Sequence, residues 1–455
     1  MPIDILTNAF VNGPEIIPGW PYIKAYGPLA LTLGITKYYF RGSVNTWERD
    51  MHGKVYMVTG GTSGLGAEIV REIASKGAQI ILLVRSVQDS WLIEYIEDLR
   101  ESTDNFMIYA EECDLDSLYS VRKFATKWLD NQPPRRLDGV ICCAAETIPI
   151  GKTRQTTIDG IEKQMGVNYL AHYHLLTLLA PSLRSQPPDR DVRVLIATCA
   201  TQALGQIDLN DLVFENTRYE TRKPYKLYGT SKLLLGLFAK DFQRRCNEYE
   251  RKDKAPTNVK INLINPGLMR TPSTRRFLSM GSIWGLIIYM ILYPIWFIFF
   301  KNAYEGQQSF LFALWSPIFL TMNGGQLIQE CKVLKPSRKE FQDVELQKTI
   351  FDKTEELISR VEKQSAIERK RQEKIEEMSK SKEQRLKEAK ERHLAELKKK
   401  QDLTEKPQDT EELQSKLNFL RQQINKEVLF PEDVSSATNA IKSNKSNSKS
   451  KKSKK

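Results

Sequence analysis

Short, nearly continuous runs of apolar and β-branched residues recur through most of this 455-residue chain. Strands that are apolar along their whole length are typical of a parallel sheet whose two faces are both covered by helices. Amphipathic stretches suited to such helices lie between the runs, at 67–75, 117–129, 164–179 and 228–244. The pattern predicts an α/β fold with a single doubly wound parallel sheet, whose strands include residues 55–58, 80–84, 140–143, 192–197 and 259–264.

Composition divides the chain into four parts. Residues 1–50 form a lead rich in aromatic residues, proline and glycine, and we expect it to lie near a membrane. Residues 51–335 hold the α/β domain, with an apolar insertion at 277–300. The tail over 336–430 is rich in Glu, Lys, Arg and Gln, which favours helix. Residues 431–455 end in a run of lysines without acidic residues, and we expect them to be disordered.

The tail also contains two candidate coiled-coil seams. Their apolar residues are Leu346, Ile350, Leu357 and Val361, then Leu413, Leu417, Leu420 and Ile424. The sequence thus leaves open a homodimer formed through the fold or through the tail, and a tail that reaches a partner or lies on anionic lipid. Half of the net charge of +12 falls in residues 341–455, which hold 28 basic and 22 acidic side chains. No aromatic residues alternate with the terminal lysines, so we expect no specific binding of nucleic acid.

Cysteine and histidine usage excludes several protein classes. None of the six cysteines forms a CxxC pair, which argues against a secreted disulfide scaffold and against a zinc ribbon. The four histidines lack ligand spacing, so no metal site is predicted. The first ten residues show no basic stretch before an apolar run, so we expect no secretory signal and a reducing compartment.

A glycine-rich turn follows the first predicted strand directly. Glycines at such a turn let the backbone approach a pyrophosphate, and the N-terminus of the next helix offers free N–H groups. A lone glycine pattern also fits an ordinary tight turn, but its place inside a βαβ unit favours a dinucleotide-binding, Rossmann-like domain. No Gly-Lys-Ser/Thr follows, which excludes a P-loop. The turn reads Thr59-Gly60-Gly61-Thr62-Ser63-Gly64-Leu65-Gly66.

The second predicted strand ends in Val84-Arg85, where an NAD-binding domain would carry a carboxylate. A guanidinium at this point can bind the 2′-phosphate of NADP(H), although it would also fit a solvated cation at a strand end. The sequence therefore favours NADP(H) as the cofactor.

Together with the turn, the motif Tyr228-Gly229-Thr230-Ser231-Lys232 resembles the short-chain dehydrogenase/reductase superfamily over about residues 51–335. Residues 305–308 are similar to its retinol-dehydrogenase-like branch, and the lead is similar to fungal lipid-droplet oxidoreductases of that branch. The resemblance implies that Asn168 holds a water linking Lys232 to solvent. It implies cofactor contacts from Thr59, Gly60, Ser63, Gly64, Leu65, Gly66, Arg85, Asp114, Tyr228, Lys232, Pro266, Gly267 and Thr271.

The residues themselves also support acid–base chemistry. Tyr228 and Lys232 are four residues apart on a predicted helix and so share one face, as they would on an ordinary surface helix. A phenol has an ordinary pKa of about 10 and is a poor base at neutral pH. A nearby ammonium and an oxidised nicotinamide both favour the phenolate. Tyr228 would then give a proton to a carbonyl oxygen as hydride arrives, or remove it in the reverse direction.

Two positions depart from the superfamily pattern. Its Asn-Asn-Ala-Gly segment is Cys142-Cys143-Ala144-Ala145 here, which removes an amide that supports the sheet. Its substrate-orienting serine aligns with Cys199, and a thiol is a weak hydrogen-bond donor. On an extended strand Thr201 would face the same side as Cys199, and Thr198 the other side, so either threonine could supply the hydroxyl.

The apolar run at 277–300 meets the length criterion for a membrane-spanning helix. Both of its flanks belong to one domain, however, so a single crossing would divide that domain. We expect a shallow insertion into a bilayer leaflet or a phospholipid monolayer, with Gly281, Gly285 and Pro294 allowing a bend. A helix buried against a partner subunit is the alternative. Aromatic side chains suited to the interface are Trp284, Tyr289, Tyr293 and Trp296.

These features predict a membrane- or lipid-droplet-associated, NADP(H)-dependent oxidoreductase that interconverts lipophilic alcohols and aldehydes or ketones. The expected catalytic residues are Tyr228, Lys232, Asn168, Cys199 and Thr201. We expect the lipid droplet, the endoplasmic reticulum membrane or both as its location, with the catalytic domain facing the cytosol. The alternative is a catalytically weak lipid-surface tether with a degenerate dehydrogenase fold.

Overall fold

The computed structural model describes residues 7, 9–11, 13–402 and 414–422. The chain divides into two compact units, Met1–Arg369 and Lys370–Lys455, and the sheet belongs to the first. The predicted disordered end at 431–455 lies outside the described residues, as do Leu413 and Ile424 of the second predicted seam.

One eight-stranded sheet has the order β3-β2-β1-β4-β5-β6-β7-β8. All neighbours pair in parallel except β7 and β8, which are antiparallel, and this confirms the predicted doubly wound α/β fold. The strand order reverses between β1 and β4, and ligands of such sheets bind at this switch point. The strands are β1 (Val55–Thr59), β2 (Gln79–Val84), β3 (Ile108–Glu112), β4 (Gly139–Cys142), β5 (Val192–Ala197), β6 (Val259–Asn265), β7 (Leu327–Gln329) and β8 (Lys332–Leu334).

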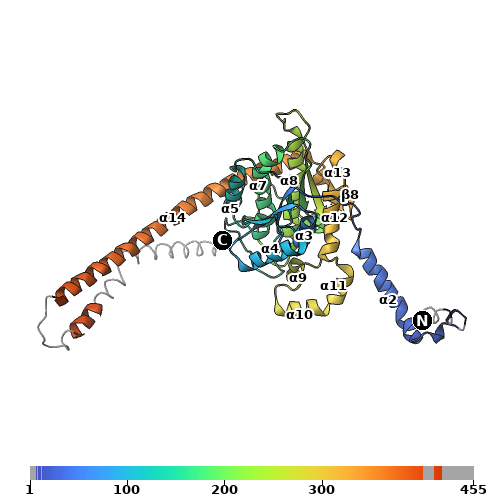
Figure 1. Cartoon of the computed structure of the whole chain (residues 1–455), viewed down its shortest axis with the longest axis horizontal. Helices are drawn as coiled ribbons and strands as arrows, with labels where there is room; N and C mark the ends of the chain where they lie inside the picture. Colours follow the sequence, from blue (N-terminus) through green and yellow to red (C-terminus); the bar gives the residue numbers. More distant parts are fainter. Residues whose placement is uncertain (1–6, 8, 12, 403–413, 423–455) are drawn as a thin grey trace, which may run out of the picture. The chain divides into compact units, whose positions relative to one another are not determined.

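Helices cover both faces of this sheet, as the nearly continuous apolar strands require (Figure 1). Along β1, Val55 and Met57 face one layer while Tyr56 and Val58 face the other. The first layer consists of α5 (Leu118–Leu129), α7 (Ala171–Arg184) and α8 (Pro224–Glu248). The second consists of α3 (Gly64–Ser75), α4 (Ser90–Thr103) and α12 (Ala303–Trp315).

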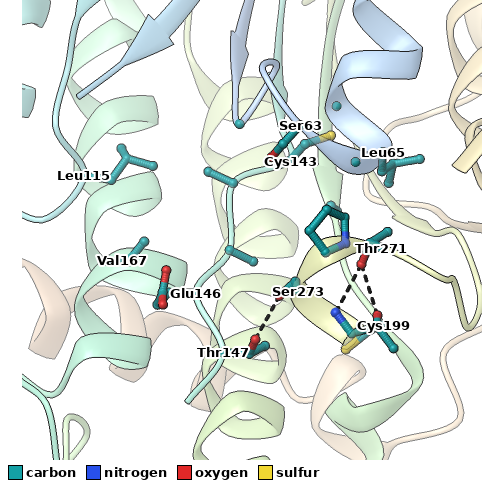
Figure 2. A pocket seen from close by; sticks show the side chains of 18 of the residues that line it. Ser63, Leu65, Leu115, Cys143, Glu146, Thr147, Val167, Cys199, Thr271 and Ser273 are labelled. Atoms are coloured by element: carbon teal, nitrogen blue, oxygen red, sulfur yellow. Dashed lines mark hydrogen bonds between the residues drawn. The ribbon is translucent and has the colours of Figure 1, made fainter. Parts of the chain in front are cut away.

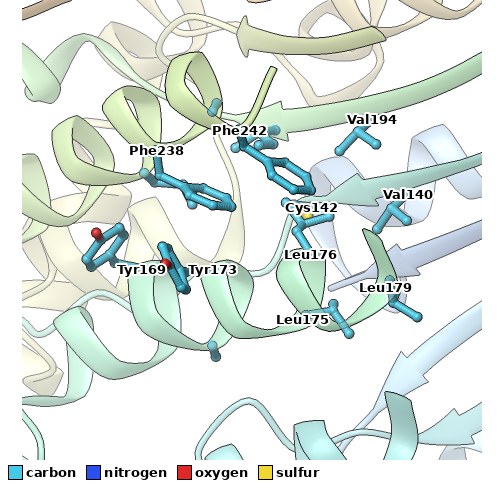
Figure 3. Packing of buried hydrophobic residues seen from close by; sticks show 14 of the residues in the cluster. Val140, Cys142, Tyr169, Tyr173, Leu175, Leu176, Leu179, Val194, Phe238 and Phe242 are labelled. Atoms are coloured by element: carbon cyan, nitrogen blue, oxygen red, sulfur yellow. The ribbon is translucent and has the colours of Figure 1, made fainter. Parts of the chain in front are cut away.

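The first layer forms the larger core (Figure 3). Figure 3 shows side chains of α7 and α8 packed over Val140 and Val194 of the central strands. Short elements connect the larger ones: η1 (Pro14–Ile16), α6 (Lys163–Met165), the π-helical turn η2 (Gly166–Leu170), η3 (Ala200–Leu204), α13 (Ile318–Thr321) and η4 (Lys339–Phe341).

The N-terminal lead contains a helix that was not predicted from the sequence. Helix α2 (Trp20–Arg41) has 22 residues, and none of them is buried. Pro21 lies in its first turn, where a missing N–H costs no hydrogen bond. Its last turn packs on the apolar insertion, with the rings of Phe40 and Phe299 edge to face at 5.1 Å.

The apolar insertion folds into α9 (Pro272–Leu278), α10 (Ile283–Ile291) and α11 (Tyr293–Phe299). Gly281, with φ +58°, lies between α9 and α10, and Pro294 lies in the first turn of α11. The chain therefore turns at the first and last of the three residues that were expected to allow a bend, whereas Gly285 lies inside α10. Among the residues described, we find no helix with the length and apolarity needed to cross a membrane.

The first part of the expected tail belongs to the same compact unit as the sheet, beyond the expected domain boundary at residue 335. The first compact unit extends to Arg369, and the start of α14 (Val344–Asp402) packs on α7 and α8. Ile350 and Val361 of the first predicted seam are buried in this domain's own core, so they are not free to form a coiled coil. Apolar spacing alone cannot distinguish a helix that packs on its own domain from one that pairs with a second chain.

Phe351 is the central aromatic contact of this helix. Its ring packs against Tyr173 and Phe238, and the Arg245 guanidinium lies 3.6 Å from its centroid. We expect Phe351→Ala to lower the free energy of unfolding of the domain by about 3 kcal/mol, because it leaves a cavity in the core. Urea unfolding followed by circular dichroism measures the change. Ile367→Ala, at an exposed position of the same helix, should change it by less than about 0.5 kcal/mol, and equal effects would contradict this packing.

Candidate active site

A cleft of about 750 Å³ opens at the carboxyl ends of the parallel strands (Figure 2). The loops that follow β1 to β6 all contribute to its walls. Fourteen of the predicted site residues line it: Gly60, Ser63, Gly64, Leu65, Gly66, Arg85, Asp114, Cys199, Thr201, Tyr228, Lys232, Pro266, Gly267 and Thr271. The cleft therefore gathers residues that are up to about 200 positions apart in the chain.

The glycine turn packs more closely on its neighbours than other residues would allow. Gly60 has φ +67°, and a Cβ atom there would lie 2.8 Å from the Ala144 backbone. A Cβ on Gly66 would lie 2.2 Å from the Gly60 carbonyl oxygen, so α3 approaches the turn directly. Ser63 precedes α3 and its side chain makes no capping hydrogen bond. The first N–H groups of α3 are thus left for an anion at the cleft wall.

Thr59 supports the turn from below and, unlike the prediction, does not line the cleft. It is fully buried, and its Oγ1 accepts a hydrogen bond from the Ala144 N–H at 3.2 Å. The same oxygen lies 3.1 Å from Nε2 of His172, whose pKa burial lowers to about 3, so this imidazole is neutral. The Thr59 bond supports the segment in which Cys142 and Cys143 replace the superfamily's amides.

Arg85 follows β2 and lies largely in solvent at the cleft edge. Its Nη2 is 3.8 Å from Oε2 of Glu146, and Nη1 of Arg276 donates to Oε1 of the same carboxylate at 2.7 Å. Glu146 was not predicted from the sequence, because its place in the site depends on loops that are distant in the sequence. Further lining residues that were not predicted are Thr62, Ser86, Asp89, Trp91 and Asp116.

Tyr228 and Lys232 project from α8 into the opposite end of the cleft. Lys232 is buried, and its Nζ donates to the Ala197 carbonyl oxygen at 3.1 Å and lies 5.8 Å from the centre of the Tyr228 ring. Burial lowers the pKa of Lys232. Burial, together with the neighbouring Cys199 thiol, raises the pKa of Tyr228 well above its ordinary value. In the structure the phenol is therefore a protonated acid at neutral pH.

Cys199 lies beside this phenol, and its Sγ is 2.7 Å from Oγ1 of Thr201. The two residues are close for a reason that differs from the prediction. β5 ends at Ala197, and η3 begins at Ala200, so a helical turn rather than an extended strand brings them together. Thr198 also lines the cleft, but its hydroxyl donates to Oε1 of Gln202 at 2.9 Å. Thr201 is therefore the hydroxyl in contact with Cys199.

Asn168 acts as a structural support behind the cleft, whose walls it does not form. It is fully buried within η2. Its Oδ1 accepts from the Glu146 N–H at 2.7 Å, and its Nδ2 donates to the Glu146 carbonyl oxygen at 3.0 Å and to Ser231 Oγ at 3.3 Å. One amide therefore joins the loop after β4 to the residue beside Lys232.

Helix α9 closes one side of the cleft. Its Ser273 hydroxyl lies 2.8 Å from the Thr147 hydroxyl across the opening (Figure 2). Thr271 caps this helix by accepting from the Thr274 N–H. The side chains at this end of the cleft are mostly apolar: Leu268, Met269, Phe277, Leu278 and Phe300. In the described part of the chain no group of three or more His, Cys, Asp or Glu residues could hold a metal ion.

Comparison with known proteins agrees with this geometry. The short chain dehydrogenase family profile matches residues 54–201. An uncharacterized oxidoreductase of Saccharomyces cerevisiae is 44% identical over 388 residues, covering 81% of this chain and 95% of its own length. One of Schizosaccharomyces pombe is 41% identical, covering 80% of this chain and 97% of its own. Human retinol dehydrogenase 13 is 30% identical, covering 63% of this chain and 79% of its own.

The chain therefore belongs to the short chain dehydrogenase family and is related to the retinol dehydrogenases within it. This confirms the resemblance drawn from the glycine turn and the Tyr228–Lys232 motif.

Proposed function

We propose that this protein is an NADP(H)-dependent oxidoreductase that interconverts lipophilic alcohols and carbonyl compounds at a lipid surface. The observation that carries the proposal is the single cleft that joins the glycine turn to Tyr228. One end of this cleft is suited to a dinucleotide, and the other combines a proton donor with apolar walls.

The residues present fit a bound dinucleotide phosphate. The close approach at Gly60 and Gly66 and the uncapped start of α3 favour a pyrophosphate. Arg85, directly after β2, would bind the 2′-phosphate. Its present partner, the Glu146 carboxylate, lies 3.8 Å away and would be replaced by the phosphate. NADP(H), when bound, supplies or takes up a hydride.

Tyr228 is the proposed general acid and base. In the reducing direction its protonated phenol donates to the substrate carbonyl oxygen, and in the oxidising direction the phenolate accepts the alcohol proton. The buried Lys232 ammonium lowers the free energy of the phenolate when the reaction requires it. Cys199 and Thr201 are adjacent to the phenol, and the Thr201 hydroxyl is the stronger donor for orienting the substrate oxygen.

The substrate class follows from the far end of the cleft. Leu268, Phe277 and Phe300 offer apolar walls with little charge, which suits a hydrocarbon chain or ring. The names of the related retinol dehydrogenases support an alcohol substrate of this kind.

Exposed apolar side chains support attachment to a lipid surface. Trp284 of α10 is 77% exposed, Ile291 72%, and Phe297 of α11 47%. Tyr293 adds an aromatic hydroxyl, and the exposed Lys24 of α2 adds charge suited to lipid phosphates. A shallow insertion leaves the cleft on the water side, so we propose the cytosolic face of the endoplasmic reticulum or a lipid-droplet monolayer as the location.

A second candidate function, a lipid-surface tether with weak catalysis, has one specific observation in its favour. A thiol stands at Cys199 where the superfamily has a serine, and Lys232 directs its ammonium to the Ala197 carbonyl. Loss of a strong donor at this point would slow the reaction without changing nucleotide binding.

Arg85→Asp tests the cofactor. We expect it to lower the affinity for NADPH at least about tenfold relative to NADH, because a charge-assisted hydrogen bond to the 2′-phosphate is lost and replaced by repulsion. Fluorescence titration with both nucleotides measures the ratio. Arg71→Asp, on the exposed side of α3, should leave the ratio unchanged. An unchanged ratio in Arg85→Asp would argue against NADP(H) selection by this residue.

Tyr228→Phe tests the reaction. We expect kcat for the reduction of retinal or a fatty aldehyde to fall by about 10² to 10⁴, with NADPH affinity preserved. Because the pKa of Tyr228 is raised, its proton is fully present at lower pH, so the reduction rate should stay flat between about pH 6 and 9. Alcohol oxidation requires the phenolate and should rise with pH. Tyr249→Phe is the surface control, and an inactive wild-type protein that binds nucleotide would favour the tether.

Flotation with phospholipid vesicles tests the lipid surface. We expect the double variant Trp284→Glu/Ile288→Glu to reduce the floated fraction at least about tenfold, because it replaces apolar area that lipid would cover. Ile158→Glu, at a side chain 71% exposed elsewhere on the domain, should float like the wild type. Equal flotation of all three proteins would argue against insertion through α10.

A further inference from the structure

The ring of Phe297, in α11, lies between two cations that come from different parts of the chain. Lys37 Nζ of α2 lies 5.4 Å from the centre of the ring, and the guanidinium of Arg270, in the segment after β6, lies 4.8 Å from it. Each is within the range of a cation–π interaction. One aromatic side chain therefore joins the N-terminal helix to the segment that follows β6.

On the N-terminal side, Lys37 is held at several points. Its Nζ donates to the Phe300 carbonyl oxygen at 3.5 Å and to Oε2 of Glu305 at 3.4 Å. Further along, the Ser43 N–H donates to Oε2 of Glu330 at 2.9 Å, and the other oxygen of this carboxylate pairs with Lys301. The C-terminal end of α2 is therefore bonded to the residues that follow α11, and the loop after α2 is bonded to Glu330, which follows β7.

On the cleft side, Arg270 lies between Met269 and Thr271, which both line the cleft. Its Nη1 donates to the Tyr293 hydroxyl at 3.1 Å. Its N–H donates to the Lys301 carbonyl oxygen at 2.8 Å, and the Lys301 N–H donates to the Leu268 carbonyl oxygen at 2.9 Å. Helix α11 is thus connected to the wall of the cleft through side chains and backbone together.

Among the described residues, two hydrogen-bond donors lack an acceptor in the region where α2, α11 and residues 268–271 meet, which we call the junction. Nε of Arg270 and Nε1 of Trp296 are buried without a hydrogen-bond partner. Such donors cost free energy until an acceptor reaches them, and lipid headgroups carry phosphate and ester oxygens. The exposed apolar faces of α2, α10 and α11 flank the same junction.

We propose that Phe297 and Arg270 are positioning residues through which a phospholipid surface activates the cleft. This inference rests on the lipid attachment proposed above. Insertion of α2 and α11 into lipid lowers the dielectric constant around the Phe297 ring. Its cation–π contacts with Lys37 and Arg270 become stronger as a result. Lipid binds more tightly to the conformation in which both cation–π contacts are formed. It therefore favours the conformation in which residues 268–271 close on the nucleotide.

The experiment uses the full chain, vesicles of phosphatidylcholine with about one fifth phosphatidylserine, and a water-soluble short-chain aldehyde that does not partition into lipid. We expect vesicles to lower the Kd for NADPH and to raise kcat/KM by about fivefold, a change that one cation–π contact of the usual size can supply. NADPH fluorescence gives the Kd independently of turnover.

Phe297→Leu keeps an apolar side chain for lipid contact but removes the π face, and Arg270→Gln removes the cation. Both should float with vesicles and keep their vesicle-free activity, yet lose the activation. Phe106→Leu, an exposed position on the domain, is the control and should be activated like the wild type. If the wild type does not float, the lipid attachment itself fails. If it floats without activation, or if Phe297→Leu is still activated, the coupling is wrong while the attachment stands.

Discussion

The approach of three backbone segments at the carboxyl ends of β1 and β4 is the constraint on which the cleft depends. The turn at Gly60, the start of α3 at Gly66 and the loop at Ala144 lie closer than side chains would allow. Thr59 holds this arrangement from below through the Ala144 N–H. Because the contact is made by backbone, the N–H groups of α3 face the cleft, and an anion can reach them.

A second group of contacts sets the charge at the other end of the cleft. The Lys232 ammonium is buried against the Ala197 carbonyl oxygen, while burial and the Cys199 thiol keep the Tyr228 phenol protonated. Asn168 connects this end to the loop after β4 through Glu146 and Ser231. The residue next to Lys232 is therefore hydrogen-bonded through Asn168 to the cleft-lining loop after β4, and four separate stretches of the chain hold this end of the cleft together.

Much of the fold could be predicted because its signals are local. The apolar runs became β1, β2, β4, β5 and β6, and the glycine turn fell where a βαβ unit places it. The lead and the tail were harder. Helix α2 buries no residue, so it has no core-facing pattern to detect. The start of α14 does have such a pattern, but the pattern does not say which surface it will meet.

The candidate site divides in the same way. Three features of the site can be recognised in the sequence because each depends on local geometry. They are the glycines where backbones meet, the spacing of Tyr228 and Lys232 on one helix, and Arg85 at a strand end. Other features exist only in the folded chain. They are the bond from the Ala144 N–H to Thr59, the pairing of Glu146 with Arg276, the contact of Cys199 with Thr201, and the two cations at the Phe297 ring. These contacts join segments that lie on different strands and helices, and their distances depend on how the layers pack, which no local pattern records.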